Sequence, residues 1–273
     1  MKLKVFIVFH KAFDERLALS RFSRAEIDEF FLAYGVNERH PDKKVTDLEG
    51  RARTQGVLLE HELAWYDPRL QERGFMETSC YVHLIENALH EPFDYVGIAQ
   101  YDMRWPGEAA ALVRRLAAAP SGSEVVYGMD FGPLMDGRGE FHPLAFPRLR
   151  NWDFMLESYN RFFGRQWDRG MLAGKPLSLL QTRLMPREQF ADLAAWLEIL
   201  CEELYPWANQ APYETHWGVL GGHTECAQAL FVAARLAEGA IRFEPLPLEH
   251  DERIAGALGV GIEHYGEPPN ARG

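Results

Sequence analysis

The sequence predicts an α/β fold in which helices flank a mixed, mostly parallel sheet. Two continuous apolar runs, Val5–Phe9 and Tyr95–Ala99, have the pattern of strands buried on both faces, and such strands belong mostly to parallel or mixed sheets. Between them, residues 76–89 carry apolar side chains at positions i, i+3, i+4 and i+7, which is the repeat of a helix. A helix between two such strands is the arrangement expected of an α/β domain.

The remaining elements follow in chain order. A polar, charge-mixed region extends from Asp14 to about Gly56, with residues 41–44 as its clearest loop signal. Apolar patterns then predict a helix at Gly107–Ala118, a strand at Glu124–Met129, a helix at Asp153–Phe163, a strand at Ser178–Met185, a helix at Glu188–Tyr205, a long helix after Gly221–Gly222 and a strand at Ile241–Pro245.

Length and hydropathy indicate one domain. At 273 residues the chain is near the upper limit, about 250–300 residues, for a single hydrophobic core. We expect one domain over residues 1–265, with the Gly-, Pro- and aromatic-rich segment 131–174 as a substrate-binding lobe and residues 266–273 as a disordered tail. No apolar run reaches the roughly 18–20 residues of a membrane helix, and the first apolar run is too short for a secretory signal. The sequence therefore predicts a cytoplasmic protein without a membrane span.

Charge and cysteine usage narrow the class of ligand. Forty acidic and 29 basic residues give a formal net charge of −11, which repels nucleic acid, and the sequence has no basic stripe to override it. A small phosphorylated ligand held by two or three cations remains compatible with this charge. Cys80, Cys201 and Cys226 are odd in number and lie in apolar surroundings, so we expect buried thiols and neither disulfides nor a zinc site.

Polar side chains follow several of the predicted strands at the point where each strand ends. In open α/β sheets ligands bind outside the carboxyl ends of the strands, so this edge is the candidate site. Ordinary polar loop residues would give the same pattern. The side chains concerned are His10 and Lys11 after the first strand, Gln100, Tyr101, Asp102 and Arg104 after the second, and Asp130 after the third.

Three blocks in the same order resemble the capsular-polysaccharide-type glycosyltransferases. They are the strand ending in His10–Lys11, the Glu77-led helix with the following segment Tyr95–Arg104, and the helix start Gly221–Ala227. This resemblance implies a GT-A-like, Rossmann-related fold and a hexosyl- or deoxyhexosyltransferase. Its substrates would be a nucleotide-sugar donor and a saccharide acceptor, used in surface polysaccharide or glycan synthesis. It also makes segment 131–174 an acceptor-side lobe.

The resemblance assigns the nucleotide-sugar site to His10, Lys11, Glu77, Gln100, Tyr101, Asp102 and Arg104. Relatives have a basic residue where this chain has Asp102. This difference leaves open whether arginine or a metal ion neutralises the charge of the phosphates. Asp102 forms half of an Asp-x-Asp motif and is our expected ligand for Mn²⁺ or Mg²⁺; otherwise Lys11 and Arg104 act as fixed cations. Alternatively Asp102 is a turn residue or a partner of Arg104, and Glu77 favours a helix start through the helix dipole.

For catalysis, the resemblance makes Glu225 the general base if transfer inverts the anomeric centre. We expect Glu225 in the first turn of its helix, where a carboxylate also stabilises the helix without any catalytic role. Asp130 is the second candidate base, and His223 is expected on the acceptor side. Aromatic rings that stack on sugars or pack within the domain are Trp152, Tyr213 and Trp217.

Two other functions remain open at this point. A hydrolase or phosphotransferase would use the same strand-end carboxylates, but neither a nucleophile elbow nor a Walker loop occurs in the sequence, which leaves only a metal-dependent variant. A non-catalytic nucleotide- or sugar-binding protein is compatible with the incomplete Asp-x-Asp. Turnover of a nucleotide sugar would separate a binding protein from an enzyme.

Overall fold

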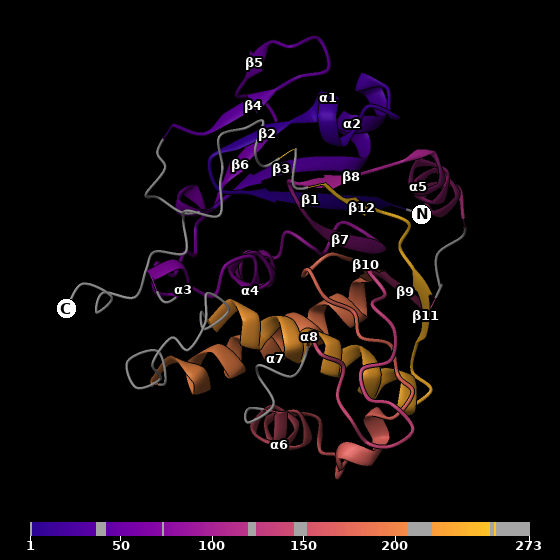
Figure 1. Ribbon diagram of the computed structural model, residues 1–273. Coiled ribbons are helices and arrows are strands. Elements are labelled where there is room, and N and C mark those ends of the chain that lie inside the picture. Colours follow the sequence, from indigo (N-terminus) through magenta and orange to yellow (C-terminus); the bar gives the residue numbers. More distant parts are fainter. Residues whose placement is uncertain are drawn as a thin grey trace, which may run out of the picture.

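A seven-stranded sheet runs through the middle of the molecule, and most of the helices pack against it (Figure 1). The computed structural model describes residues 2–36, 42–72, 74–119, 124–144, 152–206, 220–251 and 254. The strand order is β11-β9-β10-β7-β1-β3-β6, and β10 runs antiparallel to both of its neighbours. The predicted mixed, mostly parallel sheet is confirmed. Its strands are β1 (Leu3–Phe9), β3 (Phe31–Gly35), β6 (Val57–Leu59), β7 (Tyr95–Gln100), β9 (Val125–Gly128), β10 (Arg183–Pro186) and β11 (Arg242–Pro245).

Strand β1 lies at the centre of the parallel part of the sheet. It pairs with β3 on one side and β7 on the other, so Val5 faces Phe31 and Gly97 in the two registers. At Gly97 an added Cβ would lie 2.3 Å from Leu184 Cδ2 and 3.1 Å from Val5 Cγ2. The sheet therefore excludes any side chain at this point, which brings β1, β7 and β10 close together.

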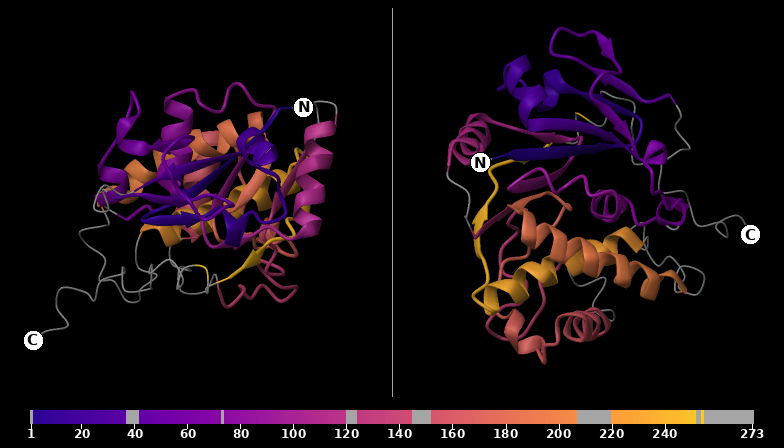
Figure 2. Two further views of the ribbon diagram at one scale, coloured as in Figure 1. Left: turned by 90° about the horizontal axis from the view of Figure 1, so that it is seen from above. Right: turned by 180° about the vertical axis from the view of Figure 1, so that it is seen from behind.

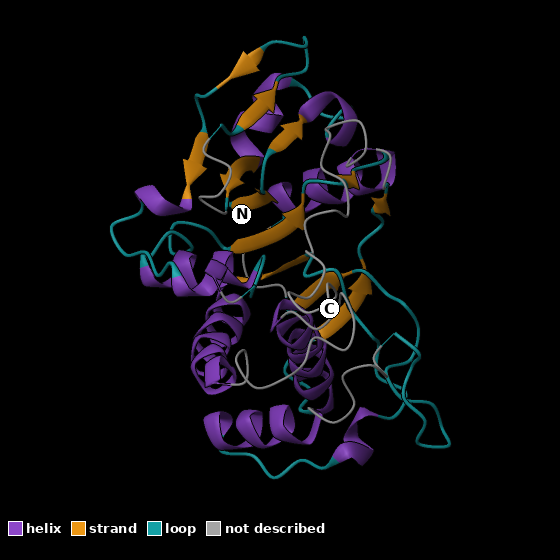
Figure 3. Ribbon diagram, turned by 60° about the vertical axis from the view of Figure 1, so that its left-hand side comes forward, coloured by secondary structure: helices purple, strands orange, loops and turns teal. Residues whose placement is uncertain are grey.

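Helices cover both faces of the sheet, as predicted (Figure 2). One face packs against α4 (Thr78–Glu86), α7 (Arg187–Leu204) and α8 (Leu220–Ala237), and the other against α1 (Glu15–Ala18), α2 (Arg24–Phe30) and α5 (Gly107–Ala118). Helix α6 (Trp152–Phe163) forms an outermost layer on α7 and α8 (Figure 3). Shorter helical segments are η1 (Glu60–Glu62), α3 (Arg69–Glu72) and η3 (Arg169–Leu172).

Two small sheets extend the architecture. Strands β2 (Ala12–Asp14), β4 (Lys44–Thr46) and β5 (Ala52–Arg53) form one of them. In the other, β8 (Met103–Arg104) pairs antiparallel with β12 (Glu249–His250), so a late segment of the chain returns to the end of β7. This return positions residues of the candidate site.

The region from Asp14 to Gly56 is more ordered than its polar composition predicts. Ser23 and Glu26 form a reciprocal capping box that starts α2, and Phe31–Gly35 then pairs with β1 as an inner strand. The sequence predicted only a polar, charge-mixed region here, and its short helices and strands were not anticipated because they lie among charged residues. Many of those charges are paired: fully buried Glu15 binds Arg24 and Arg53.

Other predicted elements differ at their bounds. The strand expected at Ser178–Met185 begins only at Arg183, because Leu180 and Gln181 have positive φ values of 63° and 48° and form a turn. The helix expected from residue 76 begins at Thr78, after Met76 with φ 57°. The three cysteines are free and buried, as expected. None of the described helices combines the length and the apolarity needed to cross a membrane.

Candidate functional site

The carboxyl ends of β1 and β7 bring His10, Glu77 and Tyr101 together. His10 Nε2 lies 3.5 Å from Glu77 Oε1, and the His10 ring meets the Tyr101 ring edge-on with centroids 6.5 Å apart. Tyr101 is fixed by a backbone hydrogen bond from its N–H to the Val8 carbonyl. Burial raises the pKa of the Tyr101 hydroxyl, and the nearby Asp102 and Glu77 carboxylates raise it further. The phenol is therefore neutral at physiological pH and can donate a hydrogen bond to a ligand.

Glu77 does not act as a helix cap through its side chain. It occupies the N-cap position of α4, but its carboxylate makes no capping hydrogen bond. Instead the carboxylate is 3% exposed, faces His10 and accepts a hydrogen bond from Gln181 Nε2 at 3.3 Å. The Glu77 side chain therefore does not cap α4 by a hydrogen bond, although the dipole of that helix still favours a negative charge at its start.

Asp102 and Arg104 pair with the returning C-terminal segment and not with each other. Asp102 Oδ2 lies 3.1 Å from His250 Nε2, and the Asp251 N–H donates to the Asp102 carbonyl. Arg104 donates to the Asp251 carboxylate, with Glu249 3.9 Å away. The Arg104 guanidinium is therefore partly neutralised by two carboxylates, which weakens it as a phosphate ligand.

The second oxygen of Asp102 is the feature that points to a cation. Asp102 Oδ1 is buried, and no hydrogen-bond donor reaches it from the part of the chain that the structure describes. A buried carboxylate oxygen without a donor is costly unless a ligand supplies the missing charge. Within the described ranges no cluster of three or more His, Cys, Asp or Glu side chains is arranged to hold a metal ion. An Mn²⁺ or Mg²⁺ ion here would take Asp102 Oδ1 as its protein ligand and its remaining ligands from diphosphate oxygens and water, while His250 contacts the other oxygen of the carboxylate.

Glu225 lies one turn later in its helix than we expected. Helix α8 already includes Leu220, so Gly221 and Gly222 are helical and Glu225 is in the second turn. The glycines do not break the helix, because they serve close packing: a Cβ on Gly221 would lie 2.9 Å from Met76 and 3.1 Å from the Gly74 carbonyl. The Glu225 carboxylate is 8% exposed and accepts a hydrogen bond from the Leu180 N–H.

That hydrogen bond connects Glu225 to a strained turn at the same edge of the sheet. Leu180 and Gln181 are consecutive non-glycine residues with positive φ, a conformation that persists only where neighbours enforce it. The Leu180 carbonyl accepts from Thr182 Oγ1, which in turn accepts from the Gln100 N–H at 3.3 Å. The turn thereby connects Glu225 to Gln100, the last residue of β7.

The other predicted residues are more dispersed. Lys11 follows β1 and is half-buried, whereas Asp130 follows β9, is exposed and caps its own turn by accepting from the Gly132 N–H. His223 is half-buried on α8. Trp152 is 1% exposed and packs on Phe141 in the core, so its ring has no face open to a saccharide. Trp217, Tyr213 and the expected tail 266–273 lie outside the described residues.

Four residues of the site were not anticipated from the sequence: Gln181, Thr182, Gln228 and His250. Their partners are far away along the chain; Gln181 is 104 residues from Glu77, and His250 is 148 residues from Asp102. Only the polar residues 249–251 after the last apolar run gave a signal, and it was not distinguishable from an ordinary loop.

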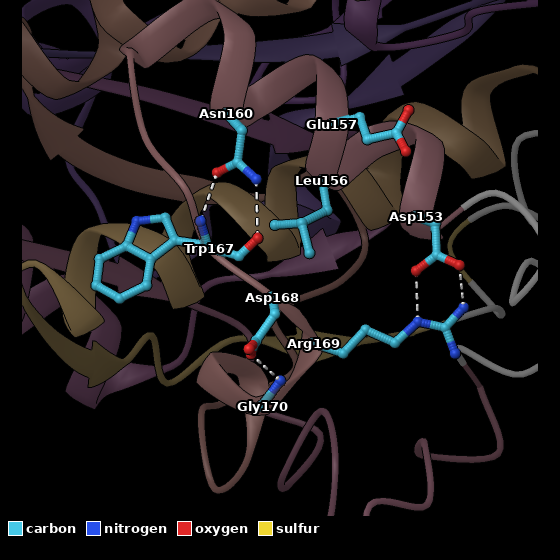
Figure 4. Close-up of a pocket in the computed structure, with 8 residues that line it drawn as sticks. All are labelled: Asp153, Leu156, Glu157, Asn160, Trp167, Asp168, Arg169 and Gly170. Carbon is cyan, nitrogen blue, oxygen red and sulfur yellow. Dashed lines mark hydrogen bonds and ion pairs between the residues drawn. The ribbon is translucent and has the colours of Figure 1, made fainter.

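A separate pocket of about 550 Å³ lies on the outermost layer, within the expected acceptor-side lobe (Figure 4). Its polar groups are largely satisfied by one another. Arg169 pairs with Asp153 through two contacts of 2.5 and 2.6 Å. The Asn160 amide donates to the Trp167 carbonyl and accepts from the Trp167 N–H. The layer of α7 and α8 separates α6 from the sheet, so this pocket is not part of the strand-end site.

Comparison with known proteins gives a fold likeness without a sequence match. No family model matches the chain, and no curated protein matches it either. The solved apo structure of the WbbM bifunctional glycosyltransferase matches over 92% of this chain with a TM-score of 0.60 and 12% sequence identity. This chain spans 45% of that protein's length. The likeness shows a shared fold and confirms the predicted GT-A-like architecture.

A second similar structure is the apo form of mouse xyloside xylosyltransferase 1. The match has a TM-score of 0.35 and 13% identity, and it covers 89% of this chain and 84% of the mouse protein.

Proposed function

We propose that this protein is a glycosyltransferase that moves a sugar from a nucleotide-sugar donor to a saccharide acceptor. The observation that carries the proposal is the Asp102–His250 pair with its unsatisfied carboxylate oxygen, located at the end of β7 in a fold shared with a glycosyltransferase. In such a sheet the carboxyl ends of the strands are where a nucleotide binds. We also propose surface polysaccharide or glycan synthesis as its setting and a hexosyl or deoxyhexosyl group as the transferred sugar.

The donor would occupy the strand-end edge. His10 and Tyr101 would hydrogen-bond the nucleotide, and Lys11 would contact the phosphates. Asp102, oriented by His250, would hold Mn²⁺ or Mg²⁺, which would neutralise the charge that grows on the departing diphosphate. The neutral Tyr101 hydroxyl would supply a hydrogen-bond donor to the nucleotide.

The acceptor hydroxyl would lose its proton to Glu225. This carboxylate belongs to a nearly buried residue and is oriented by the Leu180 N–H, which it accepts through Oε1. A general base must lie within about 2.6–3.2 Å of the hydroxyl that it deprotonates. Asp130 is the alternative base, but its carboxylate is exposed and bonded to its own turn.

Thermal-shift measurements with UDP, GDP, CMP and TDP, each with and without Mn²⁺, test the proposal. We expect a metal-dependent rise of the melting temperature with at least one nucleotide, because a ligand that binds only the folded state stabilises it. Asp102→Asn should abolish the metal dependence. Asp94→Asn is the matched control, since it removes one carboxylate at the opposite end of the same strand, where Asp94 bonds the Lys2 N–H.

The outcomes separate an enzyme from a binding protein. No response to any nucleotide, with or without metal, would contradict the nucleotide-sugar assignment. A metal-dependent response without turnover of any nucleotide sugar in the presence of mixed saccharide acceptors would instead indicate a non-catalytic binding protein.

A further inference from the structure

A buried guanidinium lies behind the strand-end cluster. Arg183, the first residue of β10, is 1% exposed. Among the residues that the structure describes, no carboxylate forms an ion pair with it; the guanidinium donates to the Gln228 side chain and, at 2.6 Å, to the Ser178 carbonyl. A buried charge without a direct counter-ion is costly, so the dipoles around Arg183 have to compensate it.

The amides that connect Arg183 to Glu77 can be oriented in only one way. Arginine has donors and no acceptor, so Gln228 must turn its oxygen toward Arg183 and its Nε2 toward Gln181, 2.9 Å away. Gln181 must then present its oxygen to Gln228 and its own Nε2 to the Glu77 carboxylate. Both amide dipoles therefore have their negative ends toward the cation and their positive ends toward the anion, which stabilises both charges.

Neighbouring groups hold the Gln181 and Gln228 amides in place without deciding which way round each amide is turned. The Thr78 hydroxyl donates to Gln181 Oε1 at 2.7 Å and lies 2.7 Å from the Thr224 hydroxyl. A hydroxyl can donate or accept, so it serves an amide in either orientation. The Tyr81 hydroxyl donates a hydrogen bond of 2.9 Å to the backbone carbonyl of Gln181. The orientation of the two amides is thus set by the groups at either end: Arg183, which can only donate, and the Glu77 carboxylate, which can only accept.

We propose that Gln181 and Gln228 are positioning residues, because they form a one-way amide relay between the buried guanidinium and the Glu77 carboxylate. The relay occupies Glu77 Oε2 and leaves Oε1 toward His10. The Oε1 atom of Glu77 is thereby directed at the strand-end edge. The role of this carboxylate in donor binding rests on the function proposed above, whereas the relay itself does not.

Reversing the relay tests it. Gln228→Glu still accepts from Arg183 but has no N–H for Gln181, so Gln181 must turn its amide and point its oxygen at the Glu77 carboxylate. One unsatisfied buried acceptor should lower the melting temperature by roughly 2–10 °C for a chain of this size. Adding Glu77→Gln supplies an N–H to the turned amide. The double variant has the wild-type charge, keeps the hydrogen bond from Arg183 to residue 228 and reverses the two hydrogen bonds of Gln181, so we expect its melting temperature within about 2 °C of wild type.

Glu60→Gln provides the matched control for the second change. Glu60 is also fully buried, but it accepts from Gln71 and Ser79 in a separate group. Combined with Gln228→Glu, it removes the same charge and should restore nothing. A Gln228→Glu/Glu77→Gln protein that is no more stable than Gln228→Glu, including the case in which neither folds, overturns the relay. Equal rescue by Glu60→Gln overturns it as well.

Nucleotide binding tests the positioning role at restored stability. Calorimetry would use whichever of UDP, GDP, CMP and TDP gives the largest wild-type response with Mn²⁺. We expect at least roughly 10-fold weaker binding by the double variant, because its carboxylate has moved from position 77 to position 228. Wild-type affinity in the double variant would overturn the positioning role. A wild-type protein that binds no nucleotide contradicts the proposed function, while the melting temperatures still decide the relay.

Discussion

Replacing Gly221 with alanine measures how closely α8 must approach the segment before α4. The added Cβ would lie 2.9 Å from Met76 Cγ and Sδ and 3.1 Å from the Gly74 carbonyl oxygen. Alanine in a helix is favoured over glycine by about 1 kcal/mol, whereas overpacking costs about 1–3 kcal/mol. The Gly74 oxygen accepts the Gly221 N–H at 2.8 Å and is fixed by the backbone, so the clash cannot be relieved by a side chain alone. We therefore expect an overpacking cost of about 2–3 kcal/mol, in the upper part of that range, and a net loss of about 1–2 kcal/mol.

Urea unfolding and the melting temperature of the variant check this estimate. A loss of that size lowers the melting temperature by roughly 2–6 °C. Gly107→Ala is the matched control, because Gly107 is also helical and has no atom within 4 Å of an added Cβ; it should gain up to about 1 kcal/mol. A Gly221→Ala protein as stable as wild type would refute the close-packing explanation. Because Met76 precedes Glu77, the nucleotide response should weaken as well.

Three further predictions follow from single residues. Asp102→Asn and His250→Ala should each remove the metal dependence of nucleotide binding, measured by titration with Mn²⁺ or a chelator; equal affinity in chelator contradicts the metal site. Glu225→Gln keeps an oxygen for the Leu180 N–H, so donor affinity and melting temperature should hold while turnover falls roughly 10²-fold, and unchanged turnover would transfer the base role elsewhere. Arg114 and the cap at Ser23 lower the pKa of Glu26 from 4.5 to about 2, so its stabilisation is complete above pH 4.5 and is lost as the pH falls to about 2. Urea unfolding over this range should show a smaller pH dependence for Glu26→Gln, by less than about 1 kcal/mol because the pair is near the surface.

Patterns of adjacent residues predicted the fold better than they predicted the site. The continuous apolar run before Gln100 and the regular apolar face of α7 gave strand and helix directly, because burial on a strand or a helix leaves a short-range repeat. Strand β3 lies in a comparable apolar run, residues 30–36, and was missed because the region around it was judged by its many charged residues.

The strand-end residues of the site could be anticipated for the same reason, but their partners could not. Gln181 and His250 reach Glu77 and Asp102 only through the turn before β10 and the pairing of β8 with β12. Neither arrangement leaves a local pattern in the sequence, and Gln181 belongs to a turn that ordinary preferences would give to glycine or asparagine. Contacts that depend on strained backbone or on distant pairing are outside what short-range periodicity can indicate.

The return of β12 to β8 also sets the order in which the protein can be completed during synthesis. At about 5–20 residues per second, a ribosome makes His250 roughly 7–30 seconds after Asp102, because 148 positions separate them. Until then β8 has an unpaired edge, and Arg104 has not met Asp251. The central strands can already associate in that interval. The nascent chain therefore passes through a stage in which most of its sheet exists while the contact between Asp102 and His250 does not.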